Sequence, residues 1–492
     1  MTLPIDCDVL VVGGGPTGVT LGLLLARGGV KTLVVDKAAD IYPLPRAAHV
    51  DHEIMRIFQE LGVADKVAAT CRTSERYDFL TAKGEVLLRF EGMERIGPGG
   101  WPISNMIHQP SIEAILRAAA REQPKLDVQT NWNWTSYCNH EGAVTSTIVT
   151  PEGERHIRSR FLVGADGARS PVRAAADIAM DDLGFDEEWL VIDALVKDFE
   201  RLPKVNLQIC DPTRPTTCVL MGSGRHRWEF MLKPGETAER MLDDDVIAGL
   251  LKPWNVEGAV TLERKAVYRF NAKVAKSWRR GAIFLAGDAA HLTPPFAGQG
   301  LCAGLRDAAN LAWKLVAVSR GADEALLDTY QTEREAHARP IISLAMMMGR
   351  TVCIADPVAA RTRDEEMLAA RASGTSPDGA VSNPPLGDGF LLAGSPEAGN
   401  YFPQFLTSEM QRLDDVLGPG AWLIARSPPN TAHGGIPFET IILDDRRLDP
   451  FRPQLEAWLA KHGADAVLVR PDRYIFGTGT PDVLARAWSA RP

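Results

Sequence analysis

The sequence contains few of the features that mark secreted or metal-binding proteins. Its 492 residues include seven cysteines, an odd number, and none of them belongs to a CxxC pair. The usual spacing of zinc ligands and of redox-active cysteine pairs is therefore missing, and we expect no metal site. Scattered cysteines of this kind favour a reducing compartment, so we expect a cytoplasmic protein.

Long apolar runs and basic clusters are also missing. The longest apolar stretch near the N-terminus, residues 9–26, contains five glycines, whereas a membrane-spanning helix needs about 20 apolar residues. No basic segment typical of a secretory signal precedes it. The formal net charge is −9 and no basic stripe stands out, which makes nucleic acid a poor candidate for a partner. These absences predict a protein with no membrane partner and no nucleic-acid partner.

The composition is that of an ordinary folded protein. Hydrophobic residues make up 45% and charged residues 24% of the chain, and both values are near the average for globular domains. Disordered, collagen-like and disulfide-stapled chains have different compositions and are excluded. At roughly 150 residues per domain, the length suggests about three domains.

The order of apolar patterns along the chain predicts an α/β protein. A strand, a helix and a second strand are expected between residues 5 and 36, and together they form one β-α-β unit. Short alternating runs between 185 and 275 predict an antiparallel sheet, and the stretch 371–400 is rich in loop-forming residues. Further expectations are helices at 51–61, 111–122 (capped by Ser111), 304–318 and 326–348, a hairpin at 77–90, strands within 127–163 and a small α/β unit at 401–492.

A glycine motif lies at the first strand–helix turn. Residues 13–18 read GGGPTG and satisfy GxGxxG. Gly13 permits the tight turn, Gly15 lets the backbone approach a diphosphate at the helix N-terminus, and Gly18 lets helix and strand pack closely. Asp36 ends the next strand, where it can bind both ribose hydroxyls and would repel a 2′-phosphate. The motif predicts an ADP-ribose ligand of the NAD or FAD type; the alternative is a glycine-rich turn in an unrelated α/β unit.

Two further motifs follow apolar strands. In GADGARSPVR at 164–173, Asp166 could anchor a turn or bond a cofactor, with Arg169 as a positive charge nearby. In GDAAHLTPPFAGQG at 287–300, Asp288 suits a ribityl hydroxyl, and backbone amides at a helix start would stabilise an electron-rich flavin edge. Taken singly, an ordinary Asp-Gly turn and a plain glycine-rich loop remain the alternatives.

Together and in this order, the three motifs resemble those of the class A flavoprotein aromatic hydroxylases, over about residues 5–345. Two segments, PRAAHVDHEIMRIFQELG at 45–62 and GQGLCAGLRDAANLAWKL at 298–315, are most similar to the 3-(3-hydroxyphenyl)propionate hydroxylase and phenol hydroxylase branch. The resemblance implies a GR2-type Rossmann-like FAD-binding domain with an inserted antiparallel β-sheet substrate domain. It also implies NAD(P)H- and O2-dependent hydroxylation of a phenolic ring through a C4a-hydroperoxyflavin, in aromatic catabolism.

The resemblance further implies roles for single residues, with FAD as the resident cofactor and NADH or NADPH and O2 as co-substrates. Pro295 would face the flavin and the substrate. Asp36 would bind the adenosine ribose, and Asp288 the ribityl chain. The other implied contacts are Arg46 and Gln109 with the phosphates or the ribityl region, Asp166 and Arg169 with FAD and NAD(P)H, and the backbone of Gly300, Leu301 and Cys302 with the isoalloxazine.

A phenol hydroxylase also needs a group that draws the proton from the substrate, because phenolate character makes the ring more nucleophilic. A histidine with a pKa near neutrality can do this. His49 is the candidate, since it follows Arg46 in a segment that the family places near the flavin; a packing role is the alternative. If the substrate bears a carboxylate, an arginine should meet it. Candidates in the sheet region are Arg225 and Arg269, with Trp228 as a wall, although surface and core roles stay open for all three.

The resemblance and the patterns together predict how the chain divides. No cysteine lies beyond Cys353, so a thioredoxin-like tail would lack redox cysteines. We expect a small-molecule phenolic substrate and allow for a homodimer. The expected parts are an FAD-binding domain in three pieces (1–76, 101–180 and 276–350), a substrate-domain hairpin (77–100), a β-sheet substrate domain (181–275), a helix and linker (351–400) and a thioredoxin-like C-terminal domain (401–492).

Two other functions stay open. Another FAD enzyme of the same fold, such as an oxidase or a halogenase, would share the motifs, but the WxWxIP motif usual in halogenases of this fold is missing. A non-catalytic FAD- or NAD-binding regulator is the third hypothesis. The intact third motif argues against it, because a pure binder needs no amides at the flavin edge.

Overall fold

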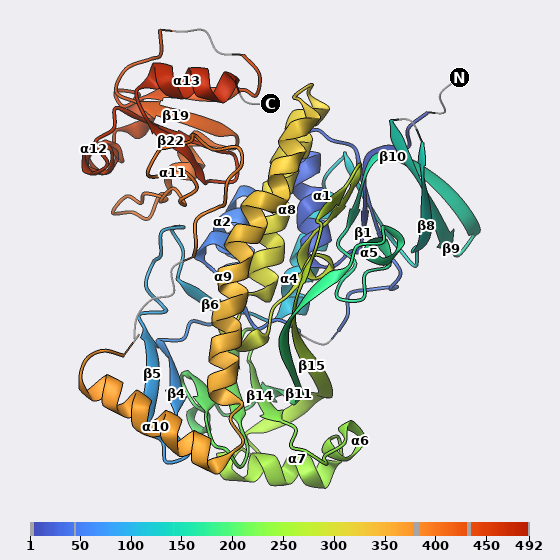
Figure 1. The fold of residues 1–492 in the computed structure, drawn as a ribbon, viewed down its shortest axis with the longest axis vertical. Coiled ribbons are helices and arrows are strands. Elements are labelled where there is room, and N and C mark those ends of the chain that lie inside the picture. Colours follow the sequence, from blue (N-terminus) through green and yellow to red (C-terminus); the bar gives the residue numbers. More distant parts are fainter. Residues whose placement is uncertain (1–3, 44–45, 141, 377–382, 431–433, 491–492) are drawn as a thin grey trace.

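The computed structural model describes residues 4–43, 46–140, 142–376, 383–430 and 434–490. Within these residues there are two eight-stranded sheets, a four-stranded sheet and a two-stranded sheet, and the long helix α9 (Thr329–Val352) runs past both large sheets (Figure 1). The C-terminal sheet and its helices form a lobe at one end of this helix. The α/β class predicted from the sequence is confirmed.

The first sheet is built around the N-terminal β-α-β unit. Its strands follow the order β16-β17-β10-β1-β2-β7, with β8 and β9 attached to β10. β1 (Cys7–Val12) pairs in parallel with both β2 (Thr32–Asp36) and β10, and nearly all of its residues are buried, as expected for an apolar run inside a parallel sheet. The other strands are β7 (Leu126–Thr130), β8 (Asn133–His140), β9 (Ala143–Thr150), β10 (Gly153–Gly164), β16 (Arg279–Arg280) and β17 (Ile283–Leu285).

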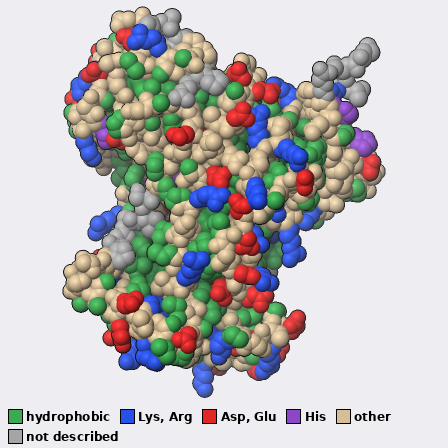
Figure 2. All heavy atoms as spheres, in the orientation of Figure 1, with side chains coloured by type: hydrophobic (Ala, Val, Ile, Leu, Met, Phe, Trp, Pro, Cys, Tyr) green, Lys and Arg blue, Asp and Glu red, His purple; other side chains and the backbone are tan. Residues whose placement is uncertain are grey.

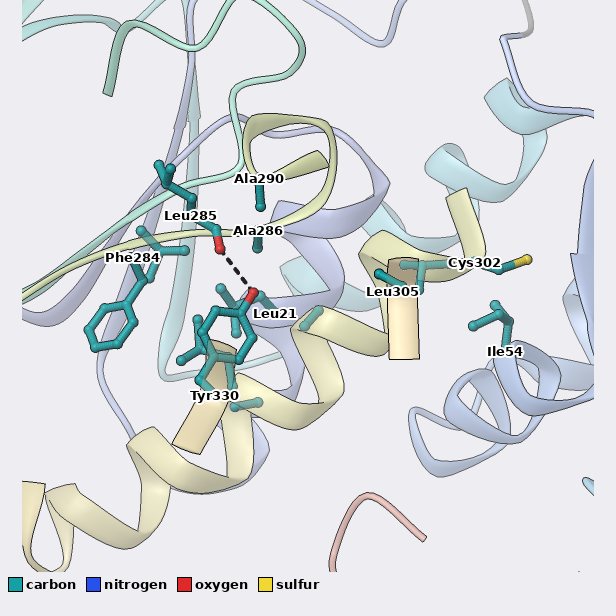
Figure 3. Packing of buried hydrophobic residues seen from close by; sticks show 14 of the residues in the cluster. Leu21, Ile54, Phe284, Leu285, Ala286, Ala290, Cys302, Leu305 and Tyr330 are labelled. Atoms are coloured by element: carbon teal, nitrogen blue, oxygen red, sulfur yellow. Dashed lines mark hydrogen bonds between the residues drawn. The ribbon is translucent and has the colours of Figure 1, made fainter. Parts of the chain in front are cut away.

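Helices pack on this sheet and fix the strand ends from which the second and third motifs emerge. The Tyr330 hydroxyl of α9 donates a hydrogen bond to the Leu285 carbonyl of β17 at 2.9 Å, among packed apolar side chains (Figure 3). This bond holds the carboxyl end of β17, directly before the third motif. The helices of this part are α1 (Pro16–Arg27), α2 (His52–Glu60), α3 (Ala64–Ala68), α4 (Gln109–Arg121), α5 (Pro171–Ala175) and α8 (Gly300–Ser319).

The second sheet has the order β18-β15-β11-β14-β13-β12-β4-β5 and is largely antiparallel. One face packs on α7 (Asp244–Leu251), where Trp228, Phe230 and Ile247 share a core. Because strand side chains alternate, the neighbouring positions point to the opposite face. The strands are β4 (Arg76–Leu80), β5 (Val86–Glu91), β11 (Met180–Val196), β12 (Asn206–Ile209), β13 (Thr216–Met221), β14 (Arg225–Met231), β15 (Val260–Ala275) and β18 (His291–Leu292), with α6 (Ala238–Met241) beside α7.

The C-terminal lobe has a four-stranded sheet of order β20-β19-β21-β22 with a core of its own. α10 (Pro357–Ala372) precedes the lobe and packs against β5. Acidic and basic side chains are interspersed over the face of the molecule in Figure 2. The lobe contains β19 (Ala421–Ala425), β20 (Phe438–Ile442), β21 (Ala466–Val469), β22 (Ile475–Gly479), α11 (Leu413–Leu417), α12 (Arg452–Lys461) and α13 (Pro481–Ser489); a separate two-stranded sheet pairs β3 (His49–Asp51) with β6 (Ser104–Met106).

Most local expectations are confirmed, and one cap is wrong. The hairpin at 77–90 forms from β4 and β5, and its turn places Gly84 at φ +86°. The helix expected from Ser111 instead begins at Gln109, because Pro110 fits the first turn, where its missing N–H costs nothing. Ser111 therefore lies inside the helix, and its hydroxyl contacts His108 Nδ1 at 2.8 Å.

No single helix of the described residues is long and apolar enough to cross a membrane. The segments Glu324–Val352 and Pro357–Ala372 reach the required length and apolarity only when taken jointly, and they are bent by 116° relative to each other.

Candidate functional site

A cavity of about 970 Å³ lies between the two large sheets. Its wall includes the GGGPTG turn, the end of β2, the third motif and the open face of the second sheet. Ligand sites commonly measure about 300–1,000 Å³, so this volume can hold an extended ligand. The described residues contain no cluster of three or more His, Cys, Asp or Glu side chains arranged to hold a metal ion.

The glycines at the phosphate end differ in what requires them. Gly13 has φ +110°, and a Cβ there would lie 2.2 Å from the Ala165 carbonyl oxygen. A Cβ on Gly18 would lie 1.9 Å from the Gly13 carbonyl oxygen, so these two glycines are required by the fold. Gly15 has φ −76°, and a Cβ there would meet no protein atom within 4 Å. It faces the cavity at the N-terminus of α1, where unpaired amides attract an anion, so the cradle fits a diphosphate.

Two backbone amides fix the orientation of the Asp36 carboxylate. Its Oδ2 accepts a hydrogen bond from the Gly14 amide at 2.7 Å, and its Oδ1 accepts one from the Ala38 amide at 2.8 Å. Arg117 donates to the Gly14 carbonyl at 2.7 Å and lies 3.9 Å from the carboxylate. The Asp36 side chain remains 19% exposed on the cavity wall, so it can still accept bonds from ligand hydroxyls. The sequence did not single out Arg117.

Gln109 organises the segment that carries Arg46 and His49. Its Oε1 accepts a hydrogen bond from the Ala47 amide at 2.7 Å, and its Nε2 donates to Glu113 at 2.7 Å. Gln109 and Arg46 both line the cavity, as their expected contact with the cofactor requires. The Arg46 guanidinium lies over the Tyr42 ring, 4.8 Å from its centre.

The second motif reaches the cavity through one of its two expected residues. Asp166 lines the cavity and accepts a hydrogen bond from the Val172 amide at 3.0 Å, which anchors the turn before α5. Burial raises the pKa of its carboxyl group. Arg169 is exposed and is not among the residues that line the cavity, so its expected contact with FAD and NAD(P)H stays a prediction.

The third motif forms another part of the cavity wall. Asp288 opens onto the cavity, and its surroundings raise the pKa of its carboxyl group by desolvation. Pro295, Gly300 and Leu301 also line the cavity, whereas Cys302 does not. Cys302 is fully buried near Ile54 (Figure 3), because the helix turns its side chain away from the cavity.

His49 is placed to accept a proton. Its Nδ1 lies 3.0 Å from the Gly298 carbonyl oxygen. A carbonyl can only accept, so Nδ1 carries the proton and Nε2 keeps its lone pair. Burial lowers the pKa of His49, which keeps the ring neutral at physiological pH. The imidazole lines the cavity beside the third motif, where a neutral base can meet a substrate hydroxyl.

The three residues expected to bind the substrate lie elsewhere. Arg225 pairs with Glu263 at 2.6 Å, and Arg269, whose side chain is 64% exposed, pairs with Asp186 at 2.5 Å. Trp228 is fully buried in the core beneath the other face of the sheet. None of the three lines the cavity, in keeping with the surface and core roles left open for them; with Trp228 facing α7, its neighbours Arg227 and Glu229 face the cavity.

The sequence analysis thus missed the polar residues of the second sheet that line the cavity. The sequence of β14 did indicate them, because it alternates charged residues with aromatic ones inside an otherwise buried strand. A charged residue that stays buried must be paired or face a ligand site. The missed lining residues are Tyr77, Asn206, Gln208, Thr217, Arg227, Glu229 and Arg264.

Comparisons with known proteins agree with this architecture. The model of the family described as FAD binding domain matches residues 6–345, and that of the HcaD C-terminal domain matches residues 440–491. A probable NADH-specific resorcinol 4-hydroxylase of Rhodococcus jostii is 35% identical, over 96% of this chain and 91% of that protein. A 3-(3-hydroxy-phenyl)propionate/3-hydroxycinnamic acid hydroxylase of Mycolicibacterium smegmatis is 31% identical, over 99% and 92%.

Solved structures share the fold. The flavin-dependent monooxygenase PieE, in complex with FAD and substrate, matches with a TM-score of 0.81 at 23% identity over 99% of both chains. Aklavinone-11 hydroxylase with FAD and aklavinone matches with a TM-score of 0.77 at 24% identity, also over 99% of both. With a family model matching most of the chain and relatives that align over nearly its full length, the chain belongs to the class A flavoprotein aromatic hydroxylases and uses FAD as its cofactor.

Proposed function

We propose that the enzyme hydroxylates a small phenol with NADH and O2 in aromatic catabolism. The observation that carries the proposal is the continuity of the cavity, from Asp36 through Asp288 to His49 and onward to the second sheet. One cavity can therefore hold an extended dinucleotide and a ring beside it. NADH is favoured over NADPH because the relative in Rhodococcus jostii is named as NADH-specific.

The residues of the proposed site have separate roles in binding FAD and in activating the phenol. Bound FAD supplies the chemistry that activates O2 for ring hydroxylation. Amides at the Gly15 turn and the Asp36 carboxylate hold the diphosphate and ribose, and Asp288 meets the ribityl chain. Pro295 packs against the ring system and excludes water. His49 Nε2 accepts the proton of the phenol hydroxyl as the ring is attacked, which raises the nucleophilicity of the ring.

The proposal also divides the chain by role. A GR2-type FAD-binding unit comprises 1–76, 101–180 and 276–350, and the substrate unit comprises 77–100 and 181–275. In support, the β4–β5 hairpin joins the second sheet through β12, far from it in sequence. The segment 351–400 links these units to a thioredoxin-like tail at 401–492 without redox cysteines, whose mixed sheet and flanking helices suit such a fold.

Two properties of the whole protein belong to the same proposal. We place it in the cytoplasm, in keeping with seven cysteines that all remain free. A homodimer is proposed as its assembly state. Sedimentation of the FAD-loaded enzyme tests the second point, since a mass of one chain at assay concentrations would contradict it.

The test is a reconstituted assay. Purified protein loaded with FAD should oxidise NADH faster when the right phenol is added, consume O2 and release a product that carries one more oxygen atom. NADPH serves as the matched co-substrate and should be used less efficiently. Failure of every phenol in a broad panel to stimulate NADH oxidation would overturn the proposal. Stimulated oxidation that yields only hydrogen peroxide would favour an oxidase.

A further inference from the structure

The substrate side of the cavity is a short polar row on the second sheet. Glu229 of β14 is in register with Val191 of β11 and with Thr217 of β13, and Thr217 is in register with Gln208 of β12. All four side chains line the cavity. Directly paired residues on neighbouring strands have Cβ atoms about 4.5–5.5 Å apart, so this row forms a compact wall of the cavity that His49 and Pro295 also line.

Most polar side chains of the row form hydrogen bonds with one another or with Tyr77. Thr217 Oγ1 donates to Gln208 Oε1 at 2.7 Å, and Gln208 Nε2 donates to the Tyr77 hydroxyl at 2.5 Å. The Tyr77 hydroxyl in turn donates to the Phe296 carbonyl at 3.2 Å. This chain of bonds connects the row to the segment that carries Pro295. Its donors are already engaged, so it fixes the wall and leaves little for a ligand to bind.

The two arginines of the wall both contact Asp193. Arg227 contacts Asp193 at 2.6 Å through Nε and donates to the Arg46 carbonyl at 2.8 Å through Nη1. Arg264 Nη1 contacts the other oxygen of Asp193 at 3.2 Å. Both guanidinium groups therefore share one fully buried carboxylate.

Glu229 differs from these neighbours. Within the described parts of the chain, the nearest ion-pair partner of its carboxylate is Arg227 Nη1 at 3.5 Å, beyond ordinary hydrogen-bond length. The side chain is 7% exposed and faces the cavity. Its oxygens therefore retain acceptor capacity toward the cavity. A ligand hydroxyl that reaches this wall can donate a hydrogen bond to the Glu229 carboxylate.

Charge counting adds a constraint on the ligand. Arg227 and Arg264 balance Asp193 and Glu229, so the four buried groups carry no net charge when all are ionised. A carboxylate on the substrate next to ionised Glu229 would bring two negative charges together in a buried site, which is unfavourable at low dielectric. A neutral hydroxyl adds no charge and can donate to Glu229 at ordinary hydrogen-bond length.

We infer that Glu229 is a specificity-determining residue that accepts a hydrogen bond from a second ring hydroxyl, so that the preferred substrate is an uncharged dihydroxybenzene rather than a phenol with an acidic side chain. The inference rests on the proposed function and narrows its substrate class. His49 receives the proton of the hydroxyl that activates the ring, while Glu229 binds the other hydroxyl and orients the ring.

The test removes the hydroxyl from the substrate and the carboxylate from the enzyme, separately and together. Resorcinol, 3-methylphenol and 3-(3-hydroxyphenyl)propionate are compared as substrates of the wild type, Glu229→Gln and Glu229→Leu, with product identification. The wild type should favour resorcinol over 3-methylphenol at least tenfold in kcat/KM. Glu229→Leu should erase that preference through a higher KM for resorcinol, while Glu229→Gln, whose amide oxygen still accepts, should retain part of it.

Controls separate the outcomes. Glu263→Gln alters a carboxylate outside the cavity that pairs with Arg225, and it should leave the preference unchanged. Should Glu229→Leu fail to fold, the dissociation constants of the two neutral phenols, read from the flavin spectrum of the wild-type holoenzyme, still test the preference. Equal use of both neutral phenols, or a wild type that prefers the propionate, would overturn the inference. If no phenol is hydroxylated at all, the proposed function itself is wrong.

Discussion

At the scale of single residues, the tautomer of His49 decides what the imidazole can do. The Gly298 carbonyl holds the proton on Nδ1, and the lowered pKa keeps the second nitrogen free as a base. Sequence position alone suggested this residue without fixing its tautomer. The backbone bond matters because it links the proposed base to the loop that carries Pro295, so that these two side chains keep their relative positions.

His49→Asn tests the base directly. An asparagine amide can still donate to Gly298, but it offers no basic nitrogen to the substrate. We expect hydroxylation to slow by about 10²-fold, the lower end for a lost general base, with FAD affinity unchanged. Because the folded pKa is lowered, wild-type kcat/KM should hold its plateau to below pH 6.5 and then fall as the base is protonated. An unchanged rate in the variant would remove His49 from the reaction.

The glycines of the first motif give a second test at this scale. Gly15→Val adds side-chain atoms that meet only the cavity, so the protein should fold normally and lose FAD affinity. Gly13→Ala places a Cβ against the Ala165 carbonyl at positive φ, so that variant should lose stability first. Thermal unfolding of the apoprotein and FAD titration separate the two. Equal behaviour of both variants would contradict the assignment of Gly15 to the ligand and Gly13 to the fold.

At the scale of elements, β14 has a polar face on the cavity and an apolar face with one buried histidine. His226 lies beside Cys218, with Nε2 3.0 Å from the sulfur, and burial lowers its pKa to about 3. The unfolded chain takes up a proton near pH 6.5, whereas the folded protein resists it until pH nears 3. The contribution of neutral His226 to the free energy of unfolding is therefore fully present above pH 6.5. It is lost as the pH falls from 6.5 towards 3.

His226→Gln should remove this loss of stability at low pH. Between pH 6.5 and 5, the wild type should lose about 2 kcal/mol more unfolding free energy than the variant, at about 1.4 kcal/mol per pH unit. Urea unfolding at several pH values, followed by tryptophan fluorescence, measures this difference. The exposed His156 supplies the matched control, since His156→Gln should keep the wild-type slope. Parallel pH profiles for His226→Gln and the wild type would contradict the assignment.

Local elements could be predicted from the sequence, whereas the face that an element turns to the cavity could not. The GGGPTG turn, the β4–β5 hairpin and the strand before Asp288 could be predicted, because each depends on local periodicity and turn residues. The face of β14 could not be chosen in the same way. Period-two alternation separates Trp228 from Glu229, but which set faces a cavity depends on α7 covering one side. Arg117 likewise acts from a helix distant in sequence, and no local pattern indicates its bond to Gly14.

At the scale of the whole molecule, the C-terminal lobe is tied to the FAD-binding part through buried polar contacts. The Tyr474 hydroxyl lies 3.1 Å from Glu53, which accepts from Arg306 Nε at 2.6 Å. Arg306 Nη1 contacts Gln299 at 3.3 Å, next to the glycine that binds His49. The lobe therefore lies at one end of a chain of contacts that reaches the cavity-lining loop of the third motif. A tail without redox cysteines can still matter for the site by holding this chain in place.

A second buried tie between lobe and core is Glu333 of α9, which is fully buried. It accepts from Lys314 of α8 at 2.8 Å and from Arg470 of the lobe at 2.8 Å, while its other oxygen accepts from the Phe390 amide at 2.7 Å. The two cations keep the pKa of Glu333 far below its usual range, and burial lowers that of Lys314 to about 8. The carboxylate is thus ionised at neutral pH and balances two buried positive charges.

Glu333→Gln should weaken this attachment severely. The amide keeps the shape but removes the charge, so Lys314 and Arg470 are left with Asp472 as the nearby anion. Breaking a buried ion pair from one side costs about 3–5 kcal/mol, and urea unfolding should show a loss of that order. Lys204→Gln breaks an exposed pair with Glu200 and should leave the midpoint unchanged. If the lobe is an independent appendage, Glu333→Gln will instead lower its unfolding midpoint alone, while FAD binding and hydroxylation stay at wild-type levels. A joint loss of stability and FAD retention is the outcome that the shared buried charges require.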